Sequence, residues 1–344
     1  MPTARNTANL RTAINVAAGL ACPLLVLCSR RASARHAVAQ ARHTGAEVIA
    51  IDVAELPKWL VPQFETSKIL LGTPFELHKD TSWKRNVGLL YAYLAGWKRI
   101  VFLDDDIAVP RPSDLCDAVT LLDSFDAVGL SIDGFPDNSV VCHAYREIGG
   151  PQDTFIGGGA LAISCSPITS FFPQIYNEDW FFLLDGENLK LRSLATTGRV
   201  KQDPYDPFAD QSRARSQEFG DTLAEGVFWL LDRDIPVEDA DTGYWLTYLQ
   251  NRRQFISDII DLVKLSDELL TRHRMIEALR AAADHNRLID PSLCVDYLAA
   301  WREDCARWRV HVEELSAAGS GNPWPEAVPL VPGMDSWPIR HDVD

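Results

Sequence analysis

The stretch Arg99-Ile-Val-Phe-Leu-Asp-Asp-Asp106 decides the fold of this chain. Its first part is an apolar run that predicts a buried β-strand, and three acidic residues follow this run without a break. Open α/β folds bind their ligands at the carboxyl ends of the strands, which is where these three carboxylates would lie. The stretch therefore predicts a β-sheet with a polar site at one of its edges.

Strands and helices alternate along the chain on both sides of this stretch. The predicted strands are continuous apolar runs, which is typical of a mostly parallel sheet that helices cover on both faces. Gly96 stands where a helix would end with a left-handed glycine. The other predicted elements are strands at 24–29, 46–52, 127–132 and 160–163, and helices at 35–43 and 83–94. This order of elements predicts an α/β fold.

Changes in periodicity divide the chain into parts. A helical pattern predicts a C-terminal extension, whereas residues 199–217 show no steady period and predict a mobile loop. Five prolines in the last 25 residues predict a tail without regular structure. The predicted parts are an arm at 1–22, an α/β domain at 23–250 with halves at 23–106 and 107–250, a helical extension at 251–318 and the tail at 319–344.

Three aromatic residues of the helical extension, Tyr297, Trp301 and Trp308, have two interpretations. Large aromatic side chains are common in cores and at interfaces alike, because each buries a large apolar area. The three residues fit a packing surface within the chain, and they also fit a surface through which two copies form a homodimer.

The charge of the chain is unevenly distributed. Its 48 acidic and 33 basic residues give a net charge of −15, which argues against binding to a nucleic acid. Residues 1–103, however, carry 13 basic and 6 acidic residues, so the N-terminal part is basic. A nucleic acid is therefore not an expected partner, whereas a small phosphorylated ligand in the N-terminal part is compatible with the charge.

Cysteine content and hydropathy bear on the location of the protein. Seven cysteines without a Cys-x-x-Cys pair are typical of reduced thiols in a cytoplasmic protein. The best candidate for a membrane span, Ala13 to Cys28, has 16 residues, fewer than the roughly 20 that a span needs. A signal peptide is the other interpretation of this stretch, but its apolar end is bounded as a buried strand would be. We therefore expect a cytoplasmic protein without a transmembrane segment.

The three acids after the predicted strand suit a hard metal ion. Adjacent carboxylates repel one another and lower stability unless a cation neutralises them. Asp104 and Asp106 would point the same way from an extended chain, so they could share one Mg²⁺ or Mn²⁺. The alternative is a solvated acidic turn, with Pro110 soon after it.

A strand that ends in Asp-x-Asp, after two earlier strands, resembles that of GT-A-fold glycosyltransferases, especially the family-2-like group. The resemblance covers roughly residues 23–240. It implies a GT-A fold with a Rossmann-like nucleotide-binding sheet, and the transfer of a sugar from a nucleotide-diphosphate donor to a hydroxyl-bearing acceptor. It also implies that Asp104 and Asp106 hold a Mn²⁺ or Mg²⁺ cofactor.

The same resemblance implies roles for further residues. The acidic pair that opens a helix in the family is matched by Glu178 and Asp179, so Asp179 would be the catalytic base, or Glu178 if the register differs by one. The family often adds a late histidine as a third metal ligand, but no histidine occurs between His143 and His273. The residues matched to nucleotide-sugar binding are Ser29, Arg30, Asp52, Lys84, Arg85, Asp104, Asp105, Gly158 and Gly159.

Electrostatics leaves an alternative for each of these charged residues. Lys84 and Arg85 stand near a predicted helix start, where the dipole disfavours cations, so they fit either a docked diphosphate or two solvated side chains. Asp179 fits either a base that takes a proton from the acceptor hydroxyl or a carboxylate that the helix dipole stabilises. Arg213, in the irregular segment, fits either a lid over the donor or a plain surface loop.

Two other functions stay open. Phosphatases of the haloacid-dehalogenase type also use a strand that ends in Asp-x-Asp, but that family places it on the first strand and has Thr or Val where this chain has Ala108. A non-catalytic nucleotide-sugar-binding module would keep the fold and lose turnover. The sequence contains no Walker A motif, no His-Glu-x-x-His, no Gly-x-Ser-x-Gly and no zinc-type cysteine spacing.

Overall fold

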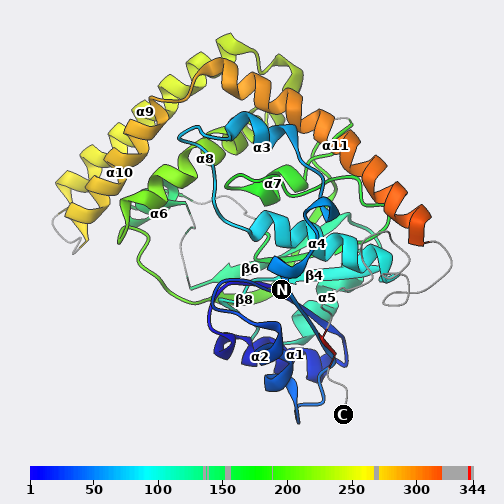
Figure 1. Ribbon diagram of the computed structural model, residues 1–344. Helices are drawn as coiled ribbons and strands as arrows, with labels where there is room; N and C mark the ends of the chain where they lie inside the picture. Colours follow the sequence, from blue (N-terminus) through cyan, green and yellow to red (C-terminus); the bar gives the residue numbers. More distant parts are fainter. Residues whose placement is uncertain are drawn as a thin grey trace.

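The computed structural model describes residues 1–134, 137, 139–151, 156–187, 189–266, 271–319 and 340–341. Two β-sheets lie in the lower and central part of the molecule, and long helices from the C-terminal half arch over them (Figure 1). The chain therefore has the α/β architecture that the order of its elements predicts, with further helices at the C-terminal end.

The first sheet has the strand order β1-β2-β3-β9. Its strands are β1 (Pro2–Thr3), β2 (Leu24–Cys28), β3 (Val48–Asp52) and β9 (Arg340–His341). The strands β1, β2 and β3 are parallel, and β9 runs antiparallel to β3. The two strands predicted before the acidic stretch are confirmed as β2 and β3, and they are parallel as expected.

The second sheet has the strand order β4-β7-β6-β8-β5. Its strands are β4 (Arg99–Leu103), β5 (Ile107–Ala108), β6 (Ala127–Asp133), β7 (Ala160–Ser164) and β8 (Leu194–Gln202). In this sheet β6 and β8 are parallel, whereas β7 is antiparallel to β4 and β6, and β5 is antiparallel to β8. The predicted strand before the three acids is confirmed as β4, within a mixed sheet.

The first 22 residues are not the loose arm that the sequence predicts. After β1 they form η1 (Thr7–Leu10) and α1 (Arg11–Leu20). The strand β1 is the edge of the first sheet, and the Thr3 hydroxyl donates to Asp105, just beyond β4, at 2.6 Å. These residues thus lie where the two sheets meet. A two-residue strand has no periodicity of its own, which is why the sequence pattern does not reveal it.

Helices cover both faces of the first sheet. Leu25 and Leu27 of β2 pack in the same core as α4 (Thr81–Leu94), whereas the alternate side chains of β2 pack with α1 and α2 (Ala34–Ala41) on the other face. This division follows from strand geometry, because successive side chains point to opposite faces. The helix α4 contacts β4 as well as β2, so it spans both sheets.

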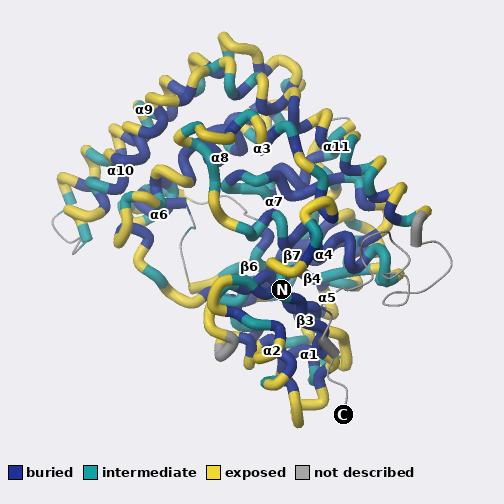
Figure 2. Tube along the Cα trace, viewed as in Figure 1, coloured by how far each residue is buried: buried dark blue, intermediate teal, exposed yellow. Residues whose placement is uncertain are grey.

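A layer of C-terminal helices packs against α4 and against shorter helices of the chain. It consists of α8 (Gln211–Leu231), α9 (Thr242–Leu265), α10 (Arg272–Asn286) and α11 (Pro291–Gly319). These helices bury one side and expose the other (Figure 2). Tyr297, Trp301 and Trp308 of α11 are fully buried within the chain, so they serve internal packing and do not form a surface for a second copy.

Residues 199–217 are not the mobile loop that the sequence predicts. They complete β8 and open α8, with a short connection between the two. The helix is hidden in the sequence because polar residues of its buried side, Gln217, Glu218 and Asp221, interrupt the apolar pattern. Periodicity assigns such residues to the solvent side of a helix. Here they form hydrogen bonds and ion pairs with residues of other elements inside the protein.

Shorter helices connect these layers. They are α3 (Glu65–Leu70), α5 (Ser113–Leu121), α6 (Val140–Glu147), α7 (Glu178–Phe182), η2 (Val53–Glu55), η3 (Lys58–Leu60) and η4 (Val237–Asp239). Within the described part of the chain, no helix is long and apolar enough to cross a membrane. The predicted tail falls outside the described residues, apart from Gly319 and the two residues of β9.

Candidate functional site

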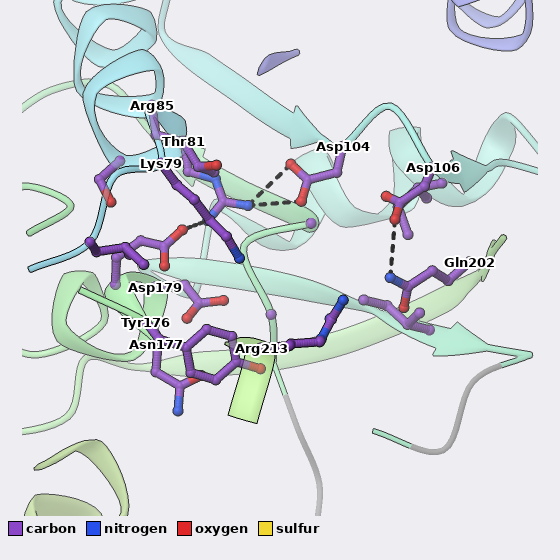
Figure 3. A pocket seen from close by; sticks show the side chains of 17 residues that line it. Lys79, Thr81, Arg85, Asp104, Asp106, Tyr176, Asn177, Asp179, Gln202 and Arg213 are labelled. Carbon is purple, nitrogen blue, oxygen red and sulfur yellow. Dashed lines mark hydrogen bonds and ion pairs between the residues drawn. The ribbon is translucent and has the colours of Figure 1, made fainter. Parts of the chain in front are cut away.

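A cavity of about 210 Å³ lies at the carboxyl end of β4. Its walls come from α4 and the segment before it, from the residues after β4, and from α7 and α8. Asp104 and Asp106 lie on the strand side of this cavity and Asp179 lies across from them (Figure 3). The charged side chains that line it are Lys79, Arg85, Asp104, Asp106, Glu178, Asp179 and Arg213. The polar site predicted at this edge of the sheet is therefore a cavity with charges of both signs.

Arg85 is the buried centre of this site. One of its terminal nitrogens donates to both carboxylate oxygens of Asp104, at 3.1 and 3.0 Å, and the other donates to Glu178 at 2.5 Å. The guanidinium also lies 5.6 Å from the ring centre of Phe172, close enough for a cation–π contact. Burial acts to lower the pKa of Arg85, but Asp104 and Glu178 outweigh it and raise this pKa. The arginine is therefore a permanent cation between two carboxylates.

Glu178 opens α7 and has an unusual protonation equilibrium. Its pKa is raised from 4.5 to about 7, because burial disfavours the carboxylate, and the charge of Asp179 adds to this effect against the opposing charge of Arg85. A carboxyl group with a pKa near 7 can both accept and release a proton at neutral pH. Glu178, the alternative of the predicted pair, therefore differs from an ordinary surface carboxylate, which is fully ionised at neutral pH.

Asp179 is held in place by backbone N–H groups, one of them that of Gly158. Its Oδ2 accepts a hydrogen bond from the Gly158 N–H at 2.5 Å, and its Oδ1 accepts one from the Trp180 N–H at 3.0 Å. A Cβ on Gly158 would come within 2.5 Å of an Arg85 nitrogen, so a side chain at this position would not fit. The glycine at position 158 therefore permits a close approach of the backbone to the acidic pair.

Asp104 and Asp106, the two predicted metal ligands, face different partners. Asp104 turns toward Arg85, whereas Asp106 accepts a hydrogen bond from the Gln202 side-chain amide at 3.2 Å (Figure 3). Among the residues that the structure describes, no group of three or more His, Cys, Asp or Glu side chains is arranged to hold a metal ion. Because donors of the chain already engage both carboxylates, the pair does not fit the predicted Mn²⁺ or Mg²⁺ as it stands.

Asp105 lies away from the cavity and bonds to the N-terminal segment. Its carboxylate accepts a hydrogen bond from the Thr3 hydroxyl at 2.6 Å, and its second oxygen lies 3.3 Å from the Nε of Arg5. The same guanidinium lies 3.2 Å from Asp106. The predicted contact of Asp105 with a nucleotide sugar is therefore taken by Thr3 and Arg5 in this arrangement.

Two further cations, Lys79 and Arg213, line the cavity. Burial and the neighbouring charge of Arg213 lower the pKa of Lys79, which stands just before α4. The Arg213 guanidinium lies over the Tyr205 ring, 4.1 Å from its centre, and donates to the Tyr205 hydroxyl. Lys79 was not predicted as a site residue, although a lysine just before a helix of the basic N-terminal part could have indicated it. Arg213 was predicted in a loop, whereas it lies in α8.

The helix α8 supports the segment that leads into α7. Asn177 lies immediately before α7 with a left-handed φ of 61°, and its side-chain amide donates to Asp221 of α8 at 2.9 Å, not to the helix that it precedes. A Cβ on Gly220 would come within 2.1 Å of the Tyr176 carbonyl oxygen, so this glycine lets the segment rest on α8. The amide of Asn177 therefore does not cap α7 but ties the segment before the acidic pair to the C-terminal helices.

Lys84 and Ser29 do not reach the cavity, contrary to the roles predicted for them. The Lys84 ammonium donates to the Ser29 hydroxyl at 2.7 Å and to the Thr3 carbonyl at 2.8 Å, and it pairs with Asp80 at 3.1 Å. The Lys84 side chain is only 2% exposed. In this structure the ammonium therefore holds β1 against the start of α4 and is not available to a diphosphate.

Arg30 and Asp52 also lie outside the lining of the cavity. The Arg30 guanidinium donates to the carbonyl of His78 at 3.1 Å. Asp52 accepts a hydrogen bond from the Ala34 N–H at 2.8 Å, at the start of α2. Of the predicted site residues, the structure brings together Arg85, Asp104, Asp106, Gly158, Gly159, Glu178 and Asp179.

A comparison with models of protein families finds no match to this chain, and a search of curated proteins finds none either.

Proposed function

We propose that this protein transfers a glycosyl group from a nucleotide-diphosphate sugar to a hydroxyl-bearing acceptor. The observation that carries the proposal is the composition of the cavity at the end of β4. It sets the carboxylates of Glu178 and Asp179 beside the cations Lys79 and Arg213, around one open space. The finer fold assignment, GT-A, belongs to the same proposal. It is supported by the Asp-x-Asp stretch that follows β4 and by the two parallel strands before it.

Asp179 is the group that takes the proton in this reaction. The Gly158 N–H fixes one carboxylate oxygen, so the side chain keeps its orientation toward the cavity (Figure 3). As the acceptor hydroxyl loses its proton to Asp179, its oxygen bonds to the anomeric carbon of the donor, and the bond from that carbon to the diphosphate breaks. Glu178, bound to Arg85, is the alternative proton acceptor.

Lys79 and Arg213 stabilise the diphosphate that leaves. Negative charge develops on the leaving oxygen as the bond to the sugar breaks, and cations already in place stabilise that charge without rearranging. Lys79 is buried enough that its pKa is lowered, which means that its ammonium is incompletely solvated and is stabilised by an incoming anion. Both residues line the same cavity as Asp179, so one donor molecule could contact all three.

A phosphatase of the haloacid-dehalogenase type is the less suitable alternative. That chemistry needs the first carboxylate after the strand as a free nucleophile. Here both oxygens of Asp104 accept hydrogen bonds from a buried arginine. A non-catalytic nucleotide-sugar-binding module uses the same cavity, and turnover separates it from an enzyme.

Donor binding and turnover are tested separately. A thermal-shift panel of UDP, GDP, ADP and dTDP sugars should contain a donor that raises the melting temperature. With that donor, Asp179→Asn should lower kcat at least about 100-fold and keep the thermal shift, because it removes the base and keeps the side-chain volume and one of the two backbone hydrogen bonds. Asp117→Asn, at an exposed carboxylate of α5, is the matched control and should leave both unchanged. No shift with any donor would overturn the proposal, and binding without turnover would favour the module.

A further inference from the structure

The three acids after β4 are each paired with an arginine of the chain itself. Asp104 is paired with Arg85 of α4. Asp105 and Asp106 share the guanidinium of Arg5, whose Nε lies 3.3 Å from the first carboxylate and whose terminal nitrogen lies 3.2 Å from the second. Two arginines from distant parts of the chain therefore supply the positive charge that a divalent cation would otherwise bring to three adjacent carboxylates.

Arg5 owes its position to a built segment of the fold. The strand β1 just before it pairs with β2, and the backbone bonds of this segment continue past the strand, from the Ser29 N–H to the Thr3 carbonyl at 3.1 Å and from the Arg31 N–H to the Ala4 carbonyl at 3.3 Å. The buried Lys84 donates to the same Thr3 carbonyl at 2.8 Å. The residue before Arg5 is thus anchored, which sets its side chain over the acids.

A second contact of this segment reinforces the ion pairs. The Thr3 hydroxyl donates to the Asp105 oxygen that Arg5 does not contact, at 2.6 Å. The side chains of Asp105 and Asp106 are only 11% and 14% exposed. A divalent ion that bridges these two carboxylates would therefore compete with the Arg5 guanidinium for Asp105 Oδ1 and Asp106 Oδ2, and with the Thr3 hydroxyl for Asp105 Oδ2.

We infer that Arg5 takes the place of a divalent cation at the end of β4, so that the site works without Mn²⁺ or Mg²⁺. Arg5 is a positioning residue, since it does not line the cavity and acts by holding Asp106, which does, together with its neighbour Asp105. The part of this inference that concerns donor binding rests on the proposed function. The competition between Arg5 and a metal ion does not rest on it.

Binding of Mn²⁺ alone tests the competition. Titration of the full-length protein with Mn²⁺, followed by the electron paramagnetic resonance of the free ion, should detect no saturable site below about 1 mM in the wild type. Arg5→Gln, which removes the charge and keeps much of the side chain's length, should create a site at least tenfold tighter. Arg11→Gln, at an exposed arginine of α1, should behave as the wild type does.

Two different results of the Mn²⁺ titration would overturn the inference about Arg5. A wild type that binds Mn²⁺ in the micromolar range shows that the acids accept a metal in spite of Arg5. An Arg5→Gln variant that stays silent shows that Arg5 is not what excludes the ion. Arg5 is half exposed, so the Arg5→Gln variant should fold. Thr3→Val provides a second variant, because it removes the hydrogen bond to Asp105 and leaves the charge of Arg5 in place. It should gain Mn²⁺ binding to a smaller extent.

The part of the inference that concerns donor binding is tested by the dependence of that binding on divalent cations. The melting-temperature increase given by the best donor of the panel should be the same in EDTA as in Mn²⁺, and Arg5→Gln should make this increase depend on Mn²⁺. An increase that EDTA abolishes in the wild type overturns the inference and leaves glycosyl transfer intact. If no donor produces an increase, the proposed function fails, whereas the result with Mn²⁺ alone still decides the role of Arg5.

Discussion

Arg85 and Asp104 form an ion pair in which one guanidinium nitrogen lies 3.1 and 3.0 Å from the two carboxylate oxygens. Arg85 belongs to α4 and Asp104 is the first residue after β4, so the pair joins a helix to the end of a strand that it contacts. The other terminal nitrogen of Arg85 reaches Glu178 at the start of α7. One buried cation therefore holds together three of the elements that enclose the cavity.

Removal of this cation should lower stability strongly. Arg85→Gln leaves Asp104 and Glu178 without their common partner, and the loss of one member of a buried ion pair costs about 3 kcal/mol or more. Urea unfolding, followed by circular dichroism, measures this free energy. Arg215→Gln, at an exposed arginine of α8, should stay within about 0.5 kcal/mol of the wild type. Equal effects of the two substitutions would contradict the central role of Arg85.

Gly158 should not tolerate even a methyl group. A Cβ there would meet an Arg85 nitrogen at 2.5 Å, and Arg85 cannot move away while two carboxylates hold it. We expect Gly158→Ala to lower the free energy of unfolding by about 1–3 kcal/mol, as overpacking does. Gly19→Ala in α1, where a Cβ meets no atom within 4 Å, should instead raise it by up to about 1 kcal/mol. Chemical denaturation of both variants checks this, and effects of the same sign would be inconsistent with it.

Glu178 should make stability depend on pH. Its pKa is about 7 in the folded protein, above the usual 4.5, chiefly because of burial. Between these two values the folded state keeps a proton that the unfolded state releases, so stability is present below pH 4.5 and is lost as the pH rises to 7. Glu178→Gln cannot titrate and should lose on the order of 3 kcal/mol less over this window. Urea unfolding at both ends of the window tests this, and parallel pH profiles would refute it.

Lys79 should affect affinity for the donor more than stability. A charge-assisted contact to a diphosphate contributes about 1.5–3 kcal/mol, so Lys79→Met should weaken binding of a nucleotide diphosphate about tenfold or more. The remaining binding should depend less on salt concentration, since one charge contact is lost. Calorimetric titration at two ionic strengths measures both effects. Lys68→Met, at an exposed lysine of α3, is the control; a Lys79→Met variant that matches it would remove Lys79 from the donor site.

The local pattern of the sequence was enough to predict the main strands and the position of the candidate site. The strands β2, β3, β4, β6 and β7 and the helix α4 follow from apolar runs and from Gly96, which has the expected left-handed φ of 70°. Acids after a buried strand must lie at a sheet edge, so Asp104 and Asp106 were placed correctly beside a cavity. These features depend on residues that are close in the sequence, and periodicity records them directly.

Only the tertiary structure decided which charges meet. Whether Asp104 faces a metal ion or an arginine depends on how α4 lies against β4, and the partner of Asp105 depends on a two-residue strand about a hundred residues earlier in the chain. Likewise, α8 is hidden in the sequence because Arg252 of α9 pairs with its buried Glu218 and Asp221. A charged residue looks the same in the sequence whether it is solvated or paired inside the protein. Its partner is set by packing between distant segments, which no local pattern contains.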